Sequence, residues 1–133
     1  MKSGSITVST KQTMELIDIT HRVSTELRDA GVTGGICVLF NPHTTAGLTI
    51  NEGADPDVRT DIIDGFRKIV PLNHPFKHME GNSPAHIMAS LMGSSLTIAI
   101  NGGAFQLGTW QKIFFCEFDG PRTRKIHFHF LEG

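Results

Sequence analysis

Short segments in which apolar and polar residues alternate recur along the chain, and this period of two limits the fold more than any other feature. Such alternation is typical of strands with one buried face. One segment, Gly35–Phe40, is apolar throughout, which is typical of a central strand covered on both faces. The sequence therefore predicts strands at 6–10, 14–17, 35–40, 48–52, 96–100, 105–107, 113–118 and 126–130, with the second strand beside the first.

Three further segments have the apolar spacing of amphipathic helices. Thr20 and Asp55 open two of them, and Ser83 is expected to cap the third, with Pro84 at its first helical position. Gly31 and Gly93 end the first and third helices. The side chains expected on the buried faces are Val23, Leu27, Ala30, Val58, Ile62, Phe66, Ile69, Ile87, Met88, Leu91 and Met92.

This order of strands and helices predicts an α+β fold. We expect a single domain over residues 1–133, with about three helices packed on one large, strongly bent, mostly antiparallel sheet of half-barrel or sandwich form. A chain of 133 residues is long enough to bury roughly two-thirds of its unfolded surface without disulfides.

Charge and hydropathy exclude several classes of partner. The formal net charge is −1 and no basic block is present, so we expect neither nucleic-acid nor membrane-surface binding. The chain has no long apolar span and its first residues lack a signal-peptide core, which predicts a cytoplasmic protein. Cys37 and Cys116 lie far apart in apolar runs and are expected to be buried thiols.

The segment from His78 to His86 holds more polar chemistry than a loop needs, because it also contains Glu80 and Asn82. With Ser83 as the cap, His86 falls in the first helical turn, beside free backbone N–H groups and the positive end of the helix dipole. This setting suits a phosphate or a carboxylate, and a neutral imidazole there is available to a metal. The ordinary alternative is that these side chains only cap the helix.

His43, His78 and His86 together form a candidate three-imidazole site for a divalent metal ion, zinc or magnesium, with one position open for substrate. The polar residues expected around it are the hydroxyl groups of Thr44 and Thr45, the amides of Asn51 and Asn82, the possible bases Glu52, Glu80 and Asp119, and Arg122 as a phosphate ligand. His127 and His129 also share one strand face, but we interpret that face as the solvated side of an edge strand.

Several well-known motifs are absent from the sequence. It has no Gly-x-x-x-x-Gly-Lys, Gly-x-Gly-x-x-Gly or Gly-x-Ser-x-Gly segment, and neither cysteine has the context of a catalytic triad. Nucleotide-binding loops and serine hydrolases are therefore not expected, and no organic cofactor is indicated.

Five motifs occur in order over nearly the whole chain: His43-Thr-Thr-Ala-Gly-Leu-Thr-Ile-Asn-Glu52, Asp55-Pro-Asp-Val58, His78-x-Glu-Gly-Asn-x-x-Ala-His86, Leu107-Gly-Thr-Trp-Gln111 and Glu117-Phe-Asp-Gly-Pro-Arg122. In these motifs the chain resembles the YjbQ-like family, also called the secondary thiamine-phosphate synthase family. The resemblance implies a bent α+β fold and a homotrimer with sites near subunit contacts. It also implies a pocket built from His43, Thr44, Asn51, Glu52, His78, Asn82, His86, Gln111 and Arg122. Met79 replaces a residue that is often polar or acidic in the family, which argues against a metal role for this side chain.

Three functions remain open at this point. The first is an enzyme with a phosphorylated small-molecule substrate, because the activity named for the family joins an aminopyrimidine diphosphate to a thiazole phosphate. The second is a metal-dependent hydrolase or deaminase-like enzyme, with Glu80 or Glu52 as the base. The third is a non-catalytic trimer that binds a metal or a metabolite.

Trp110 and Gln111 are expected at or beside a subunit contact. Trp110 is the only tryptophan, and its short turn offers little intrachain cover for an indole ring and its N–H group. The alternative is that this ring covers part of its own core.

Overall fold

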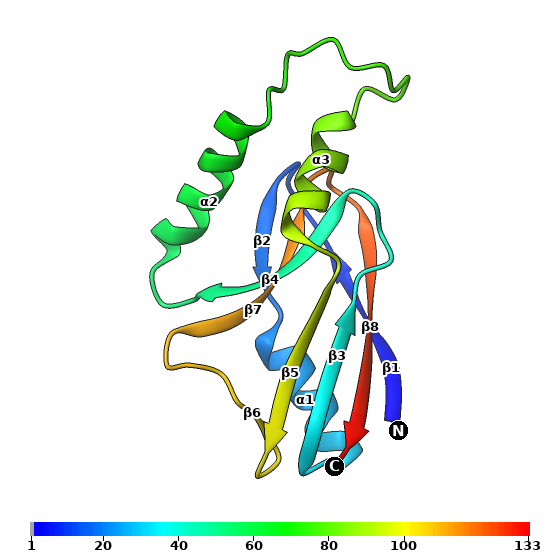
Figure 1. Cartoon of the computed structure of the whole chain (residues 1–133), viewed down its shortest axis with the longest axis vertical. Coiled ribbons are helices and arrows are strands. Elements are labelled where there is room, and N and C mark those ends of the chain that lie inside the picture. The colour runs from blue at the N-terminus through cyan, green and yellow to red at the C-terminus, as the bar shows by residue number, and fades with distance from the viewer. Residues whose placement is uncertain (1) are drawn as a thin grey trace.

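Eight strands within residues 2–133, the part of the chain that the computed structural model describes, form two antiparallel sheets (Figure 1). The first sheet has the strand order β1-β8-β3-β5-β6, and the second has the order β2-β7-β4. The strands are β1 (Lys2–Ser9), β2 (Glu15–Asp18), β3 (Gly34–Phe40), β4 (Ala46–Glu52), β5 (Ser95–Asn101), β6 (Ala104–Phe105), β7 (Gln111–Glu117) and β8 (Thr123–Glu132).

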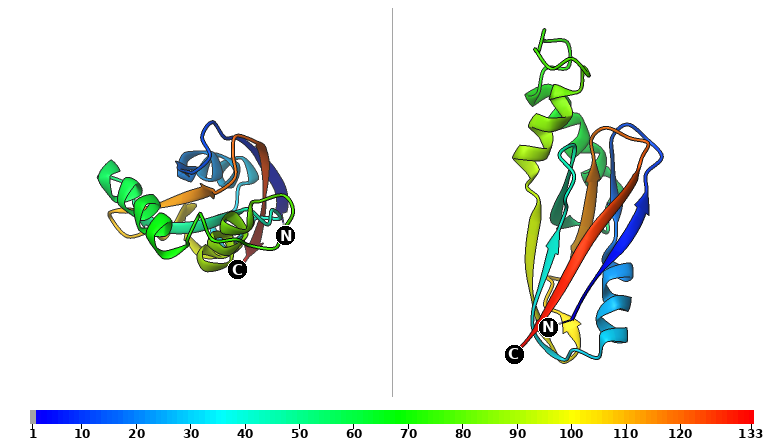
Figure 2. Two further views of the ribbon diagram at one scale, coloured as in Figure 1. Left: turned by 90° about the horizontal axis from the view of Figure 1, so that it is seen from above. Right: turned by 90° about the vertical axis from the view of Figure 1, so that its right-hand side faces the viewer.

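Three helices accompany the strands of the described residues: α1 (Thr20–Ala30), α2 (Pro56–Ile69) and α3 (Ser83–Met92). Gly31 ends α1 with φ of 68°, a left-handed conformation that glycine adopts without steric cost. Asp55 caps α2, since its side chain accepts a 2.9 Å hydrogen bond from the Asp57 amide. Figure 2 shows α1 at the end of the molecule near both termini and α3 at the opposite end.

The main core lies between the two sheets and α1, around which the sheets curl as a half-barrel. Its helical members, Val23 and Leu27, are almost fully buried. The strands contribute alternate residues to this core, as a half-buried strand must. The buried strand residues in the cluster are Ile6, Val8, Cys37, Leu39, Ala46, Leu48, Ile98, Ile100, Ile113, Phe115, Ile126, Phe128 and Phe130.

A second core lies on the other face of the three-stranded sheet, under α2 and α3. Phe114, Cys116 and Phe118 face this cluster, whereas Ile113 and Phe115 face the main core. Strand β7 is therefore buried on both faces. The other buried members of the second core are Met14, Leu16, Val70, Ala85 and Met88.

The predicted α+β class with a strongly bent antiparallel sheet and three helices is confirmed. The pairing of the first two strands is wrong, because β1 pairs with β8 whereas β2 pairs with β7 in the other sheet. The five residues between β1 and β2 carry the chain from one sheet to the other.

The sequence predicts that β3 is covered on both faces, but the strand that is buried on both faces is β7. Strand β3 is central, but Ile36 and Phe40 are 39% and 44% exposed on its outer face. Strand β8 is not an edge strand, because it pairs with both β1 and β3, so the edge assignment of His127 and His129 is wrong. Both imidazoles are half-buried on a central strand.

Two helices bury less than their apolar spacing predicts. No residue of α2 is fully buried and Ile69 is 69% exposed. In α3 the buried residues are Ala85 and Met88, whereas Leu91 is 57% exposed. This helix also begins one residue early, with Asn82 rather than Ser83 at the N-cap position.

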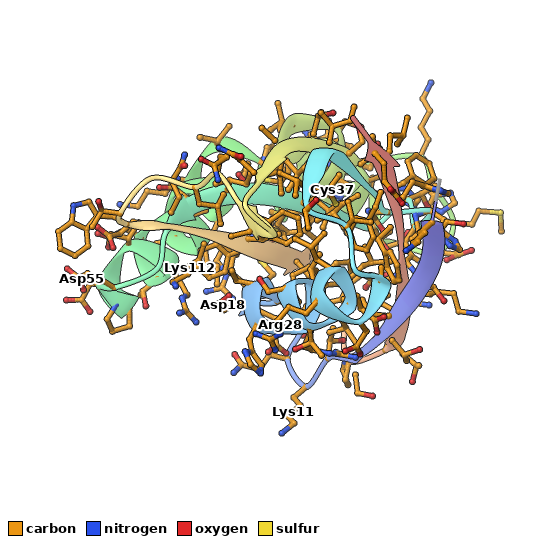
Figure 3. The ribbon with its side chains drawn as sticks, turned by 90° about the horizontal axis from the view of Figure 1, so that it is seen from below. Lys11, Asp18, Arg28, Cys37, Asp55 and Lys112 are labelled. Atoms are coloured by element: carbon orange, nitrogen blue, oxygen red, sulfur yellow. The ribbon has the colours of Figure 1, made fainter. Side chains whose placement is uncertain are left out.

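Both cysteines are buried and free, as predicted. Burial raises the pKa of the Cys37 thiol to about 12 and also raises the pKa of Cys116, because the thiolate loses its hydration. Figure 3 shows Cys37 among the side chains that fill the half-barrel. Among the described residues, none of the helices has the length and apolar character that a membrane crossing requires.

Candidate functional site

A cavity of about 400 Å³ lies where three connecting segments meet: the β3–β4 loop, the segment before α3 and the β7–β8 turn. A second cavity, of about 460 Å³, shares part of this wall through Pro42, His43, Thr44 and His86. We call the first one the histidine pocket. The residues that line it are Pro42, His43, Thr44, Thr45, His78, Glu80, Asn82, His86, Arg122 and Arg124.

The β3–β4 loop is held in shape by Asn41, which is 1% exposed. Its side-chain nitrogen donates to the carbonyl oxygens of Ala46 at 2.8 Å and His43 at 3.2 Å, and its side-chain oxygen accepts from the His43 amide at 3.0 Å. One buried side chain thus closes the loop, which fixes the backbone from which His43 and Thr45 project.

His43 is oriented by strand β8. The backbone amide of Lys125 donates a 2.9 Å hydrogen bond to His43 Nε2. Burial lowers the pKa of His43, and the charge of Arg124 lowers it further. The ring is therefore neutral near pH 7, with its proton on Nδ1, because Nε2 acts as an acceptor.

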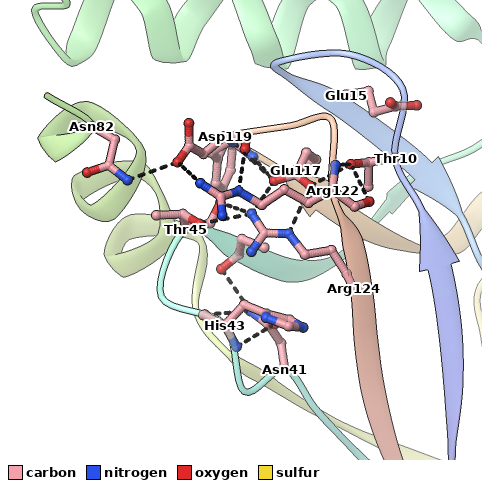
Figure 4. Close-up of polar contacts among 12 residues, drawn as sticks. Thr10, Glu15, Asn41, His43, Thr45, Asn82, Glu117, Asp119, Arg122 and Arg124 are labelled. Atoms are coloured by element: carbon pink, nitrogen blue, oxygen red, sulfur yellow. Dashed lines mark hydrogen bonds and ion pairs between the residues drawn. The ribbon is translucent and has the colours of Figure 1, made fainter. Parts of the chain in front are cut away.

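The floor of the pocket contains a buried ion pair between Arg124 and Glu117 (Figure 4). Nε of Arg124 donates to Glu117 Oε1 at 2.9 Å and Nη2 donates to Thr45 Oγ1 at 2.9 Å, while Nη2 also contacts Glu117 Oε2. The carboxylate further accepts from the Thr10 hydroxyl at 2.7 Å and from the Asp119 amide at 3.0 Å. Burial alone would raise the pKa of Glu117, but these donors outweigh it, so the pKa lies below its usual range.

The α3 side of the pocket is connected to the β7–β8 turn by Asp119. Its carboxylate accepts a 2.9 Å hydrogen bond from the Asn82 side-chain nitrogen and forms a 3.0 Å ion pair with Arg122. The Asn82 side chain makes no capping bond to α3, and its Oδ1 is buried without a hydrogen-bond partner among residues 2–133. The N-terminus of α3 thus has no side-chain cap where it borders the pocket. Pro84 has no N–H group and the Ala85 and His86 amides donate to the Asn82 carbonyl, so the free N–H groups expected beside His86 are not found there.

His78 and His86 face each other across the α3 end of the pocket. Their ring centroids are 5.3 Å apart, and the rings meet nearly edge to face at 87°. Within residues 2–133, the His, Cys, Asp and Glu side chains form no group of three or more that is placed to hold a metal ion. Since Nε2 of His43 already accepts a bond from Lys125 and Nδ1 carries the proton, His43 has no free lone pair for a metal ion, unlike His78 and His86.

The pocket brings together most of the residues expected at the site. It contains His43, Thr44, Thr45, His78, Glu80, Asn82, His86 and Arg122, and Asp119 bonds to two of them. Asn51, Glu52 and Gln111 do not join them within one chain. Figure 1 shows β4 running away from the β3–β4 loop toward the start of α2, and these three residues lie at that distant end, paired across β4 and β7.

Sequence reasoning missed Arg124, Glu117 and Asn41. Glu117 carried a usable signal, because a single carboxylate inside an otherwise apolar strand must find a buried partner. Its partner Arg124 follows in the next strand, where it alternates with exposed residues and resembles a surface cation. Asn41 gave no comparable signal.

Comparisons with known proteins agree on one family. The family model described as UPF0047 protein YjbQ-like matches residues 4–133. UPF0047 protein YugU of Bacillus subtilis (strain 168) is 46% identical over 124 residues, covering 92% of this chain and 94% of the relative. UPF0047 protein MJ1081 of Methanocaldococcus jannaschii is 51% identical over 120 residues, covering 90% and 87%.

Solved structures match the whole fold. An uncharacterized conserved protein of the yjbq/upf0047 family from Clostridium acetobutylicum superimposes with a TM-score of 0.93 at 50% identity, over 96% of this chain and 98% of that one. Hypothetical protein APE1520 from Aeropyrum pernix K1 gives a TM-score of 0.95 at 37% identity, over the full length of both chains. With a family model over residues 4–133 and relatives this similar, the chain belongs to the UPF0047 protein YjbQ-like family.

Proposed function

We propose that this protein is an enzyme that binds a phosphorylated small molecule in the histidine pocket and promotes departure of a phosphate or pyrophosphate group. The observation that carries the proposal is the convergence of three imidazoles and Arg122 on one cavity of about 400 Å³ beside the N-terminus of α3. Donors fixed in advance around departing oxygens stabilise the charge that develops there, which is the largest contribution in many enzymes.

The charged and the neutral side chains of the pocket would have different roles. Arg122 keeps a permanent charge and is half-exposed at the pocket, where it can draw an anion in. His43 is neutral and presents an Nδ1–H donor, while His78 and His86 are placed to accept or supply a proton. The specific activity that the family resemblance suggests is the joining of an aminopyrimidine diphosphate to a thiazole phosphate, with release of pyrophosphate.

The direct test incubates purified, metal-replete protein with the two precursors and measures thiamine phosphate. We expect product above a no-protein control, and a loss of at least about tenfold in the His86→Ala variant if this side chain takes part in proton transfer. No product above the control would refute the specific activity. A broader screen of phosphate esters and diphosphates, measured as phosphate release, tests the general proposal, which fails if no turnover depends on His86.

A metal-dependent hydrolase is the second candidate, favoured by the 5.3 Å separation of the His78 and His86 rings. His78 and His86 would be the first two ligands of a divalent ion such as zinc or magnesium, and His43 would be the third only if it gave up its bond from Lys125, because no three such side chains of residues 2–133 are placed to hold a metal as they stand. A bound ion would polarise a phosphoryl or carbonyl oxygen, and Glu80 would serve as the base. Elemental analysis decides: one metal per chain, lost in His86→Ala and retained in His74→Ala, supports this candidate, and metal-free active protein excludes it.

We also propose that the site is completed in a homotrimer. Trp110 is 63% exposed in the single chain, and Asn51, Glu52 and Gln111 lie near it, remote from the histidine pocket. A neighbouring subunit would cover the indole and could bring these polar side chains to a pocket. Light scattering tests this: Trp110→Ala should lower the assembled mass. A monomeric wild type at micromolar concentration, or a fully trimeric variant, would contradict it. A non-catalytic trimer that binds a metabolite remains the outcome if assembly is seen without turnover.

A further inference from the structure

Arg124 combines two properties that rarely occur together: it is only 4% exposed, yet it lines the histidine pocket. Its Nε and Nη2 groups are fully engaged by Glu117 and Thr45. Nη1 makes no hydrogen bond within residues 2–133, and it is not among the buried unpaired atoms there, so solvent in the pocket reaches it. One end of a buried guanidinium is thus left for a partner that the chain does not supply.

The position of this group is fixed before any ligand arrives. Glu117 is 0% exposed and is itself held by the Thr10 hydroxyl and the Phe118 and Asp119 amides, at 2.7 to 3.1 Å. A guanidinium anchored on such a carboxylate has lost its side-chain rotations during folding. A ligand that bonds to it therefore avoids most of the ordering cost that a surface arginine imposes on binding.

His43 places a second donor in the same pocket. Because Nε2 accepts from the Lys125 amide, the ring proton is on Nδ1, and Nδ1 makes no hydrogen bond within the described residues. Figure 4 shows the Arg124 guanidinium between Glu117 and His43. The floor of the pocket thus presents N–H donors from two oriented side chains.

We infer that Arg124 is an anion-binding residue of the histidine pocket, with Nη1 donating to an anionic oxygen of the ligand and Glu117 and Thr45 acting as positioning residues. The inference deepens the proposed function and rests on it, since it names the group that holds the phosphate. The Glu117 carboxylate neutralises much of the positive charge of Arg124. Binding of an anion to Arg124 is therefore driven by its unpaired N–H donors rather than by long-range attraction. Arg122, with its side chain 51% exposed, supplies the attraction from the rim.

Calorimetric titration with inorganic phosphate tests this assignment. We expect the wild type to bind, and Arg124→Lys to lose about ten- to hundredfold in affinity, since an ammonium cannot reproduce the two-sided fork. Thr45→Val keeps the ion pair and the 3.3 Å bond from Nη2 to the residue 45 carbonyl but removes the 2.9 Å bond to the hydroxyl, so a loss of about three- to tenfold is expected. Arg28→Gln, on an exposed helix face, is the matched control and should bind as the wild type does.

A second measurement guards against variants that fold poorly. In wild-type protein labelled with ¹⁵N-arginine, phosphate should shift the Nη resonances of Arg124 more than its Nε resonance, because Nε stays bonded to Glu117. A merely structural ion pair would show no such shift. Unchanged phosphate affinity in both Arg124→Lys and Thr45→Val, or resonances that do not respond, would overturn the inference while leaving the proposed function in place.

Titration with malonate can support Arg124 as an anion ligand even where the proposed phosphorylated substrate fails. Binding of this dicarboxylate with loss in Arg124→Lys, but no binding of phosphate, would support Arg124 as an anion ligand and overturn the phosphorylated substrate. Failure of the wild type to bind either anion at tens of millimolar would overturn both.

Discussion

The backbone amide of Lys125 and Nε2 of His43 are joined by a 2.9 Å hydrogen bond that crosses from strand β8 to the β3–β4 loop. This contact ties the loop to the centre of the larger sheet and selects the Nδ1–H tautomer of the ring. The orientation of a pocket imidazole is thus set by a strand rather than by the loop that carries it.

The lowered pKa of His43 predicts a specific pH dependence of stability. The unfolded chain binds a proton at His43 more readily than the folded chain does, so protonation favours unfolding. The contribution of neutral His43 to the free energy of unfolding is therefore complete above about pH 6.5. It is lost as the pH falls from there through the lower folded pKa. In the presence of a chelator, urea unfolding at pH 7.5 and 5.5 should show a larger decrease for the wild type than for His43→Gln. Equal decreases in the two proteins would contradict the prediction.

Removing the side chain of Asn41 should destabilise the fold and disturb the pocket together. Asn41→Ala leaves two carbonyl oxygens and one amide without their partner, at a cost of about 2–3 kcal/mol in the free energy of unfolding. Chemical denaturation measures the cost, and Asn73→Ala in an exposed loop serves as the control. A loss under roughly 0.5 kcal/mol would show that the loop holds its shape by other means.

Breaking the buried ion pair on one side should cost more than removing both charges. Glu117→Gln leaves the Arg124 cation without its counter-charge, and we expect a loss of about 3–5 kcal/mol. Adding Arg124→Met should recover part of this loss, because the unpaired buried charge is then absent. The double variant is compared with both single variants by denaturant unfolding, and simple additivity would count against a coupled pair.

Gly35 is a position where the backbone excludes any side chain. Its φ is +118°, and an added Cβ would lie 1.9 Å from the Leu131 carbonyl oxygen. Gly35→Ala should therefore destabilise the protein by at least about 3 kcal/mol or prevent folding. Gly65→Ala is the matched control: a Cβ at this position in α2 meets nothing within 4 Å, so a gain of about 0.5–1 kcal/mol is expected.

The two thiols should be unreactive in the native protein. Burial raises the pKa of Cys37 to about 12 and raises that of Cys116, so little thiolate exists at pH 8 and reagents cannot reach the sulfur atoms. Mass spectrometry after iodoacetamide treatment should find no native alkylation and two modifications in guanidinium chloride. Rapid native labelling at one site would show that the surrounding core opens readily.

The α+β class was predictable because alternation and helical spacing are local properties of the sequence. Strand β8 illustrates this, since Ile126, Phe128 and Phe130 are all buried as their spacing indicates. Pairing between distant strands was not predictable in the same way. Whether β8 lies at an edge depends on β1 and β3 reaching it, and no local pattern in β8 records that.

The residues of the candidate site were likewise predictable where the signal is local and not where it depends on distant contacts. His43, His78, His86 and Arg122 were recognisable because polar chemistry in loops and helix starts is conspicuous, and they do share one pocket. Arg124 was not recognisable, because its burial depends on Glu117 in another sheet. Asn51 was grouped with the pocket from the sequence and Gln111 by the family resemblance, but the fold of one chain keeps both at the far end of β4 and β7.

Two walls of the histidine pocket differ in how cooperatively they unfold: the segment after α2, which carries His78 and Glu80, and strand β8, which carries Arg124. Neither α2 nor residues 71–81 contain a fully buried side chain, so the wall that carries His78 and Glu80 can open locally at a small fraction of the global unfolding free energy. The wall formed by β8 opens only when the larger sheet does. A ligand that contacts both walls therefore binds only when residues 71–81 are folded, so its affinity depends on this local folding step. Amide exchange in residues 71–81 should then slow as the ligand fills the pocket.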